Sequence, residues 1–241
     1  DMHAAQGGQS GDWHCNNIFQ ERIDFYYDKT CEDRYISLWK EFARRYKDEE
    51  WIAGYDLLNE PVAETEYEIK RLKEIYLRII GEIRSIDKSH IIFIEGNQWA
   101  QKFEMLDDEV YGDNIVYSPH YYCNAAVQDW DYPGETDGFF YDRHFMESEM
   151  DSRDSWIRQK NRPVWVGEFG VRRLGNLSGK NQALKDYLEI FESRGESWCY
   201  WNFKDLKVRG PLCLREESAW AEFTKSFIEL KLKYCTDRSL P

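Results

Sequence analysis

Apolar residues recur along this sequence at two spacings, one typical of helices and the other of buried strands. The segment from about residue 33 to 47 has the helical spacing, because its apolar residues fall three or four positions apart: Tyr35, Leu38, Phe42 and Tyr46. The short apolar run Ile52–Leu58 follows and predicts a strand. Since short strands and longer helices keep alternating, without a linker or low-complexity tract, we expect parallel β/α units in a single domain spanning residues 1–241.

The same pattern places the other expected elements. Thr65 and Glu68 have the spacing of a capping box, so a helix is expected to begin there. Its apolar face carries Ile69, Leu72, Tyr76, Ile79, Ile83 and Ile86. Gly195 is the expected stop of a later helix, because glycine readily adopts the left-handed conformation that ends helices. The remaining strands are expected at residues 91–95, 115–120, 163–168 and 197–201, and the remaining helices near 142–160, 180–194 and 217–233.

Nearly every expected strand ends in a polar or aromatic residue that is followed by a loop. In a β/α barrel this edge of the sheet is the active-site face. A single carboxylate at such an edge is more often a solvated loop residue than a catalytic group. Two carboxylates at two strand ends, with a histidine and a tryptophan at others, favour a catalytic site. The residues concerned are Glu60, Glu95, His120, Glu168 and Trp201.

Glu60 and Glu168 are the candidate catalytic pair. Cleavage of a glycosidic bond requires one carboxyl group held protonated and another held ionised across the scissile bond. In a retaining enzyme the two groups lie roughly 5 to 5.5 Å apart, and we expect that separation here. His120 and Tyr122 are placed to orient and hydrogen-bond the nucleophile, although buried polar residues with a purely structural role would give the same spacing.

Composition narrows the class of partner. The 241 residues carry a net charge of −13 without a run of Lys or Arg, which argues against nucleic acid and anionic membrane surfaces as partners. No apolar run is long enough to span a bilayer. Aromatic residues make up 16% of the chain, more than a core of this size needs, and flat rings stack on the apolar faces of sugars. A neutral glycan substrate fits these features.

Cysteine usage indicates no metal or redox site. The six cysteines are even in number but include no C-x-x-C pair, so disulfides stay open while a zinc site and a redox motif are not expected. His14 lies beside Cys15, but no further ligand follows at a metal-binding spacing. Hydrolysis by two carboxylates requires neither metal nor cofactor, and we expect none.

Five segments carry motifs in a characteristic order: Asp1–Gln9, Gly54–Pro61, Ser118–Tyr122, Val166–Gly170 and Trp198–Lys204. Together they resemble glycoside hydrolase family 5, the cellulase family of retaining β/α-barrel glycosidases. N-E-P or G-E-F-G alone is a weak motif, but five segments in the right order and spacing are specific. The resemblance runs through essentially the whole chain.

The resemblance implies roles for individual residues. Glu60 in the strand-4 motif is expected to be the acid/base, and Glu168 in the strand-7 motif the nucleophile. Asn59 is expected to bond the sugar 2-hydroxyl, and Trp201 to form the floor of the −1 subsite. Trp13, Trp99 and Trp130 fall in loops after strand ends, where they either stack on sugars or merely pack the loops. The full set of expected substrate-binding residues is His3, Asn59, His120, Tyr122, Trp201, Lys204, Trp99 and Trp130.

The same comparison exposes a departure from the family's pattern. If Asp1–His3 is the tail of strand 3, the first two β/α units have no counterpart here. The expected fold is then a partial TIM-type (β/α)8 barrel, truncated at its N-terminus to about six β/α units. The family's strand-2 arginine, which helps keep the nucleophile ionised, is missing as well, and this puts activity in doubt. Because open strand edges invite pairing, we expect a homo-oligomer, a dimer, to cover them, with a fragment of a longer enzyme as the alternative.

The expected function is that of a retaining glycoside hydrolase that cleaves β-1,4-glucan. The sequences of Asp1–Gln9 and Gly54–Pro61 are similar to those of cellulase-type members of the family. One alternative is an exo-acting β-glycosidase on short oligosaccharides, of β-glucosidase or β-xylosidase type. Another is a catalytically impaired sugar-binding protein, and mannan or xylan as substrate stays open. We expect the protein to be secreted, with any signal absent from this chain.

Overall fold

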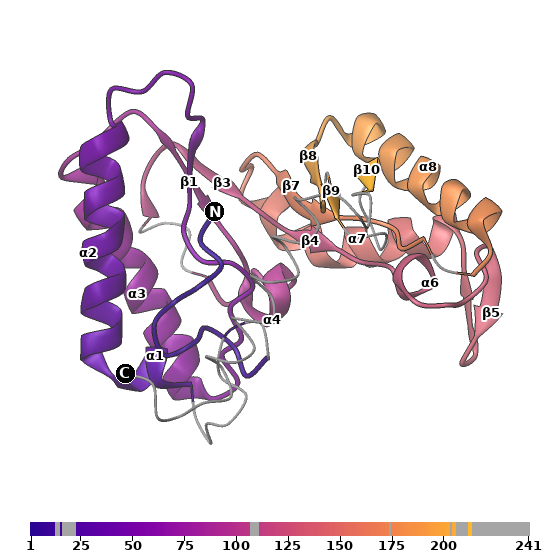
Figure 1. The fold of residues 1–241 in the computed structure, drawn as a ribbon, viewed down its shortest axis with the longest axis horizontal. Helices are drawn as coiled ribbons and strands as arrows, with labels where there is room; N and C mark the ends of the chain where they lie inside the picture. Colours follow the sequence, from indigo (N-terminus) through magenta and orange to yellow (C-terminus); the bar gives the residue numbers. More distant parts are fainter. Residues whose placement is uncertain are drawn as a thin grey trace. The chain divides into compact units, whose positions relative to one another are not determined.

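The computed structural model describes residues 1–12, 15, 23–106, 111–173, 175–202, 204–205 and 212–213. For the last two pairs only the backbone is described, as β9 (Lys204–Asp205) and β10 (Leu212–Cys213). The chain divides into two compact units. Unit 1 comprises residues 1–121, 148–167 and 195–198, and unit 2 comprises residues 122–147, 168–194 and the described residues from 199 onward. Figure 1 labels their elements.

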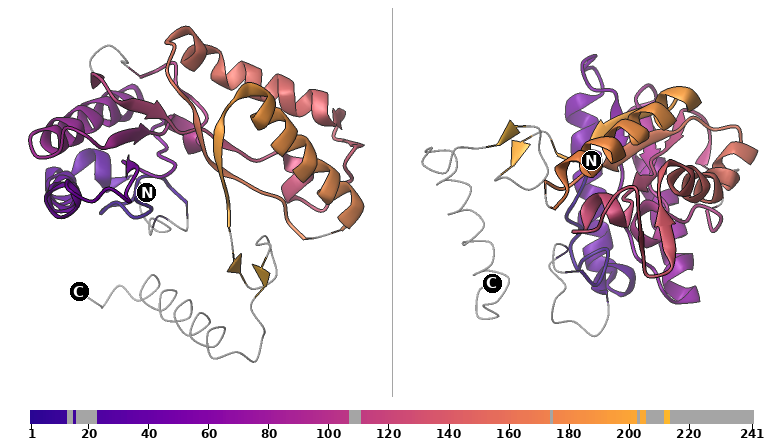
Figure 2. Two further views of the ribbon diagram at one scale, coloured as in Figure 1. Left: turned by 90° about the horizontal axis from the view of Figure 1, so that it is seen from above. Right: turned by 90° about the vertical axis from the view of Figure 1, so that its right-hand side faces the viewer.

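Unit 1 is built on a parallel sheet of three strands, in the order β1 (Gly54–Asp56), β2 (Ile91–Ile94) and β3 (Ile115–Tyr117). Two helices, α2 (Lys29–Tyr46) and α3 (Glu66–Arg84), pack side by side next to this sheet, as Figures 1 and 2 show. Each strand is followed by a helix or loop before the next parallel strand begins. The alternation predicted from the apolar spacing is therefore confirmed.

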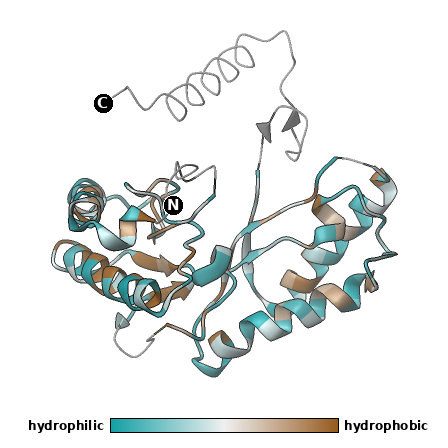
Figure 3. Ribbon diagram, turned by 90° about the horizontal axis from the view of Figure 1, so that it is seen from below, coloured by the Kyte–Doolittle hydropathy of each residue, from teal (hydrophilic) through white to brown (hydrophobic). Residues whose placement is uncertain are grey.

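The two long helices begin where side chains satisfy their first backbone N–H groups. The Asp28 carboxylate accepts a hydrogen bond from the Thr30 backbone, so α2 begins one turn earlier than the apolar spacing predicts. Thr65 and Glu68 form the predicted capping box at the start of α3. The apolar faces of both helices turn to the core, and in Figure 3 the ribbon of the β1-β2-β3 sheet is largely brown while the ribbons of the helices mix brown and teal residues.

The strand predicted over residues 115–120 is interrupted, so that prediction is wrong in detail. Ser118 still donates its backbone N–H to the Ile94 carbonyl at 2.9 Å, but Pro119 has no N–H and cannot continue the ladder. The Pro119 carbonyl accepts instead from the Gly167 N–H at 3.1 Å. The chain then resumes as β4 (His120–Tyr121), which belongs to a second sheet of order β4-β7-β8.

β7 (Trp165–Phe169) and β8 (Ser197–Tyr200) complete this sheet, as predicted from their apolar runs. α7 (Arg143–Gln159) precedes β7, and α8 (Leu177–Arg194) joins β7 to β8. α8 ends at Arg194, and Gly195 directly after it has a φ of +66°, the left-handed conformation expected of a glycine stop.

Short elements that the apolar spacing did not predict fill the connections. The antiparallel hairpin of β5 (Gly134–Thr136) and β6 (Phe139–Tyr141) lies in unit 2. The helix expected near 217–233 lies outside the described residues. Short helices among the described residues include α1 (Asp24–Tyr27), α4 (Asn97–Ala100) and α6 (Asn124–Val127).

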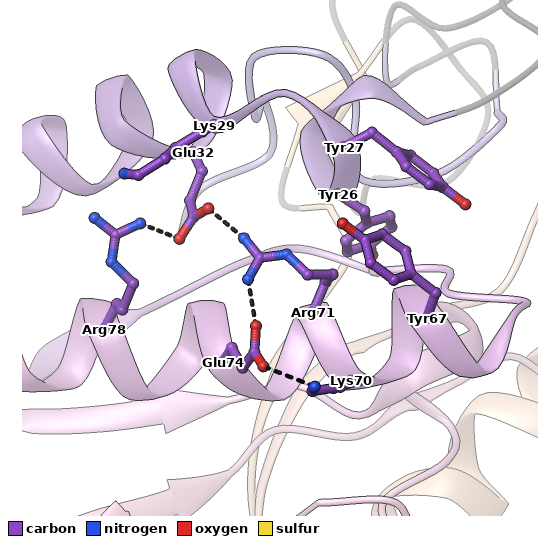
Figure 4. Close-up of a pocket in the computed structure, with 9 residues that line it drawn as sticks. All are labelled: Tyr26, Tyr27, Lys29, Glu32, Tyr67, Lys70, Arg71, Glu74 and Arg78. Carbon is purple, nitrogen blue, oxygen red and sulfur yellow. Dashed lines mark hydrogen bonds and ion pairs between the residues drawn. The ribbon is translucent and has the colours of Figure 1, made fainter.

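A network of ion pairs links α2 to α3. Glu32 on α2 is 1% exposed and pairs with both Arg71 and Arg78 on α3, as Figure 4 shows. Arg78 also reaches Asp33 at 2.9 Å, and Arg71 also pairs with Glu74. These groups line a surface pocket of about 690 Å³. The rings of Tyr27 and Tyr67 also line it and stack on each other. The lysines and arginines that line the pocket are each paired with a carboxylate. The charged side chains that line the pocket therefore have a structural role, because they hold the two helices together as a clamp.

Replacing Glu32 with glutamine is expected to lower the free energy of unfolding by roughly 2 to 3 kcal/mol, because two guanidinium groups lose a buried anion. The expected loss stays below that of a fully buried pair, since both arginines are partly exposed. Urea unfolding followed by circular dichroism measures it. Glu74→Gln is the matched control, because that carboxylate is 40% exposed, and it should cost less than about 1 kcal/mol. Equal losses in the two variants would contradict the clamp.

A second buried network surrounds Asp87 at the end of α3. Its carboxylate accepts hydrogen bonds from the Tyr55 hydroxyl at 2.7 Å and from the backbone N–H groups of Ser89 and His90, and it lies 2.6 Å from the His90 ring. Burial alone raises the pKa of Asp87, but these hydrogen bonds outweigh it and hold the pKa at about 2. The ionised carboxylate therefore belongs to the folded state.

Because its pKa is lower in the folded than in the unfolded state, Asp87 stabilises the fold above about pH 4 and loses this contribution as the pH falls towards 2. Asp87→Asn should therefore lower the free energy of unfolding by about 2 kcal/mol at pH 7, with a smaller difference from the parent at pH 2.5. Denaturant titrations at the two pH values measure this. The exposed Asp48→Asn serves as control, and a pH-independent difference for Asp87→Asn would contradict the assignment.

Within the described ranges, no helix combines the length and apolar character required to cross a membrane. Four cysteines in these ranges are free thiols: Cys15, Cys31, Cys123 and Cys199. The side chains of the other two lie outside the described residues.

Candidate active site

Glu60 follows β1 and meets two polar residues of neighbouring strands within unit 1. Its Oε1 lies 2.9 Å from Nδ1 of His120, which opens β4 and is 2% exposed. Its backbone N–H donates to Oε2 of Glu95, at the end of β2, over 2.7 Å. Nε2 of His120 lies 3.5 Å from Oε1 of Glu95. The three side chains thus come from the carboxyl ends or continuations of three parallel strands, as a barrel's active-site face requires.

The His120 ring packs closely against the backbone of β7 at Gly167. A Cβ atom at Gly167 would lie 2.4 Å from the Ser118 hydroxyl and 3.0 Å from Nε2 of His120, so only glycine fits in β7 at this point. Ser118 donates to Oδ2 of Asp56 at 3.0 Å. Burial raises the pKa of Asp56, a residue that is 9% exposed. Gly167 in the G-E-F-G motif therefore makes room for His120 of the neighbouring strand β4.

Asn59, predicted to bond the sugar, is fixed by its backbone rather than by its side chain. Its N–H donates to the Met2 carbonyl at 3.0 Å, and its carbonyl accepts from the Gln9 amide at 3.0 Å. Gln9 is fully buried and also donates to the His3 carbonyl, so it binds the first loop to the end of β1. Asn59 Oδ1 is buried and has no hydrogen-bond partner among the described residues. An unsatisfied amide of this kind is suited to a ligand hydroxyl.

The other predicted substrate-binding residues that lie in unit 1 are His3 and Trp99. Nε2 of His3 lies 2.5 Å from the Asp1 carboxylate, and both side chains are more than a third exposed. Trp99 is 42% exposed, and its indole N–H donates to Asp12 at 2.6 Å. An exposed ring held by its polar edge meets the requirement for a stacking platform, and this role stays a prediction. Trp13 lies outside the described residues.

Glu168, the predicted nucleophile, lies in β7 and belongs to unit 2. Its side chain is 6% exposed, and Oε2 accepts a hydrogen bond from the Tyr122 hydroxyl at 2.8 Å. A donor of this kind favours the ionised carboxylate. Burial and the nearby Glu168 raise the pKa of the Cys199 thiol, so that thiol is not an activated nucleophile.

Trp201 and Trp130 complete the predicted set in unit 2. Trp201 follows β8, is 36% exposed, and donates its backbone N–H to the Phe169 carbonyl at 2.8 Å. Trp130 is half-buried against the Tyr141 ring, with a centroid distance of 5.5 Å. Its loop is held by buried Lys180, whose ammonium donates to the Trp130 carbonyl at 2.9 Å. The side chain of Lys204 lies outside the described residues.

The structure shows contacts of two residues of this site that the sequence patterns did not predict. The contact of His120 with Glu60, the acid/base candidate, was not predicted, and its place beside the nucleophile stays a prediction. Glu95 had been noted only as a polar strand end, yet it bonds the Glu60 backbone. Its position directly after the apolar run Ile91–Ile94 was the available signal. The expected separation of Glu60 and Glu168 stays a prediction.

Comparison with known proteins places this chain in a family. A beta-xylosidase of Phanerodontia chrysosporium is 31% identical over 98% of this chain and 51% of its own length, so the chain spans about half of that relative. Endoglucanase C of Acetivibrio thermocellus is 23% identical over 86% of this chain and 67% of its own length.

Among solved structures, endoglucanase Cel5A from Thermotoga maritima superposes with a TM-score of 0.63 at 25% identity, covering 76% of this chain and 62% of that one. The family's structures are (β/α)8 barrels, and the parallel strands and helices of this chain correspond to part of one. The family model for cellulase, glycosyl hydrolase family 5, matches residues 9–207. The chain therefore belongs to glycosyl hydrolase family 5.

Proposed function

We propose that this chain carries the catalytic residues of a retaining glycoside hydrolase that cleaves β-1,4-glucan, with Glu60 as acid/base and Glu168 as nucleophile. The observation that carries the proposal is the different partnering of the two carboxyl groups. Glu168 accepts a hydrogen bond from a tyrosine, which favours its ionised form. Glu60 lies against a histidine, and a neutral histidine ring nitrogen can accept a hydrogen bond from a protonated carboxyl group. Retaining hydrolysis requires one group in each of these states.

In the first step of the proposed reaction, Glu168 attacks the anomeric carbon and forms a glycosyl ester. Glu60 gives its proton to the glycosidic oxygen as the bond between that oxygen and the anomeric carbon breaks, and the bonding electron pair stays on the oxygen. The leaving sugar departs as an alcohol. The mechanism requires the two carboxyl groups roughly 5 to 5.5 Å apart.

In the second step Glu60, now ionised, takes a proton from water while the water oxygen attacks the anomeric carbon. The ester bond to Glu168 breaks and its electron pair returns to the carboxylate. Both groups recover their starting protonation states. Two inversions at the anomeric carbon leave the β configuration unchanged.

The family membership supports the reaction class more strongly than the substrate. β-1,4-Glucan is proposed because two of the relatives named above are endoglucanases. An exo-acting β-xylosidase is the second candidate, since the 31% identical relative bears the name beta-xylosidase. Secretion and a homodimer stay predictions. Light scattering on the purified chain measures its mass in solution and checks the dimer.

A substrate panel tests the proposal. The purified chain is assayed on carboxymethyl-cellulose, cello-oligosaccharides and xylo-oligosaccharides, with Glu60→Gln and Glu168→Gln alongside. Internal cleavage of the glucan, lost in both variants, is the expected result. Release of single xylose units from chain ends would favour the second candidate. Binding of oligosaccharides without turnover, unchanged in Glu168→Gln, would contradict the hydrolase proposal and favour a sugar-binding protein.

A further inference from the structure

Glu95 is a buried carboxylate with no role in the two proposed chemical steps. It directly follows β2, and its side chain is fully buried. A glutamate is rarely found in this position unless its charge is hydrogen-bonded or paired. The Glu95 carboxylate contacts the backbone N–H of Glu60 and the ring of His120, which itself contacts the Glu60 carboxyl group. Its burial therefore points to a task at the acid/base.

One connection runs through the backbone of Glu60. Glu60 has a φ of +47°, in the left-handed region that residues with a Cβ atom rarely adopt. The Glu95 carboxylate accepts the N–H of this same residue at 2.7 Å, a short hydrogen bond to a charged acceptor. Strained backbone persists only where the surroundings hold it. Glu95 thus fixes the direction in which the Glu60 side chain leaves the end of its strand.

The other connection runs through His120. Oε1 of Glu95 lies 3.5 Å from Nε2 of the ring, within ion-pair range but longer than a usual hydrogen bond, while Nδ1 lies 2.9 Å from Glu60. Because Glu95 and His120 are both buried, the field of the carboxylate is weakly screened at the ring. A negative charge beside Nε2 favours the tautomer protonated there. Nδ1 then keeps a lone pair that can accept a hydrogen bond from the protonated Glu60 carboxyl.

We propose that Glu95 is a positioning residue for Glu60, acting through the Glu60 backbone amide and through the tautomer of His120. The inference rests on the proposed function, in which Glu60 delivers a proton to the glycosidic oxygen. Glu95 itself touches no reacting atom. It holds the protonated Glu60 in one orientation between His120 and the leaving group.

Glu95→Gln tests the proposal, because glutamine keeps the length and an acceptor oxygen but removes the charge. Substrates with poor leaving groups, such as cello- and xylo-oligosaccharides, need the proton from Glu60. Their kcat/KM is expected to fall 10- to 100-fold, the range seen when an outer partner of an active group is removed. With 2,4-dinitrophenyl glycosides, the leaving group departs as dinitrophenolate and needs no proton. The rate of the first step on these substrates should therefore change less than threefold.

Tyr76→Phe is the matched control. Its hydroxyl donates to the backbone carbonyl of Glu95 at 2.8 Å, so the variant removes a buried hydrogen bond at the same residue and leaves the carboxylate in place. It is expected to lower the unfolding temperature and to affect both substrate types alike. If Glu95→Gln also affects both types alike, the loss is structural and the positioning role is overturned.

A readout that needs no turnover separates this proposal from the proposed function. Nitrogen-15 NMR of the five histidines, with the His120 signals assigned from His120→Gln, reports which ring nitrogen carries the proton. Protonation at Nε2 in the parent and a shift away from it in Glu95→Gln are expected. Unchanged His120 signals would overturn the proposal even in an active enzyme. The expected shift in a chain without any turnover would support the contact and count against the hydrolase function.

Discussion

Glu168→Gln is expected to reduce the turnover of β-glycosides by roughly 10⁴- to 10⁶-fold, because a carboxamide cannot form the glycosyl ester. The fold should persist, since glutamine still offers an oxygen to the Tyr122 hydroxyl. The rate is measured as kcat on aryl β-cellobiosides and β-xylosides. Glu189→Gln is the matched control in the same unit, because that carboxylate is 45% exposed and pairs with Arg143 on the surface. Its turnover should stay within about twofold of the parent.

Azide sharpens the test of Glu168. In Glu168→Ala, azide can occupy the space of the missing carboxylate and attack the anomeric carbon of an activated aryl glycoside. A single inversion then gives the α-glycosyl azide. Appearance of the β-azide from this variant, or near-normal turnover by Glu168→Gln, would contradict the nucleophile assignment.

Glu60→Gln is expected to lower kcat/KM on oligosaccharides by roughly 10²- to 10⁴-fold, the usual contribution of general acid catalysis. With 2,4-dinitrophenyl glycosides the first step needs no acid, whereas the second step loses its base. The glycosyl-enzyme should therefore accumulate, and a rapid burst of dinitrophenol should precede slow turnover. Stopped-flow absorbance measures the burst.

The control for Glu60 is Glu64→Gln, an exposed glutamate four residues further along the chain. It should show neither the burst nor the loss on oligosaccharides. Azide added to Glu60→Ala should attack the accumulated intermediate and give the β-azide, because two inversions then occur. A uniform loss on all leaving groups would remove Glu60 from the acid/base role.

Local signals in the sequence were sufficient for the elements that local interactions determine. The capping box of Thr65 and Glu68, the glycine stop at Gly195 and the apolar face of α3 each depend on residues a few positions apart. The same holds for the assignment of Glu60 and Glu168 to strand ends, because apolar runs mark where strands finish.

The spacing of apolar and polar residues could not predict contacts between segments that are far apart in the sequence. The break at Pro119 arises because the chain changes hydrogen-bonding partner from Ile94 to Gly167, and no local signal names those partners. The contact of His120 with Glu60 was not predicted for the same reason, since residues 60 and 120 meet only in the folded sheet. Glu95 was visible as a polar strand end, but its bond to a backbone N–H 35 residues away was not.

Trapping of the covalent intermediate tests the central claim most directly. The chain is incubated with 2,4-dinitrophenyl 2-deoxy-2-fluoro-β-cellobioside and, in parallel, with the corresponding xylobioside, because the fluorine slows hydrolysis of the ester more than its formation. Mass spectrometry of the digested protein then locates the sugar. The account predicts one equivalent of label on Glu168, none in Glu168→Gln, and retained labelling in Glu60→Gln. A label on any other residue, or none with either reagent from a folded chain, would contradict it.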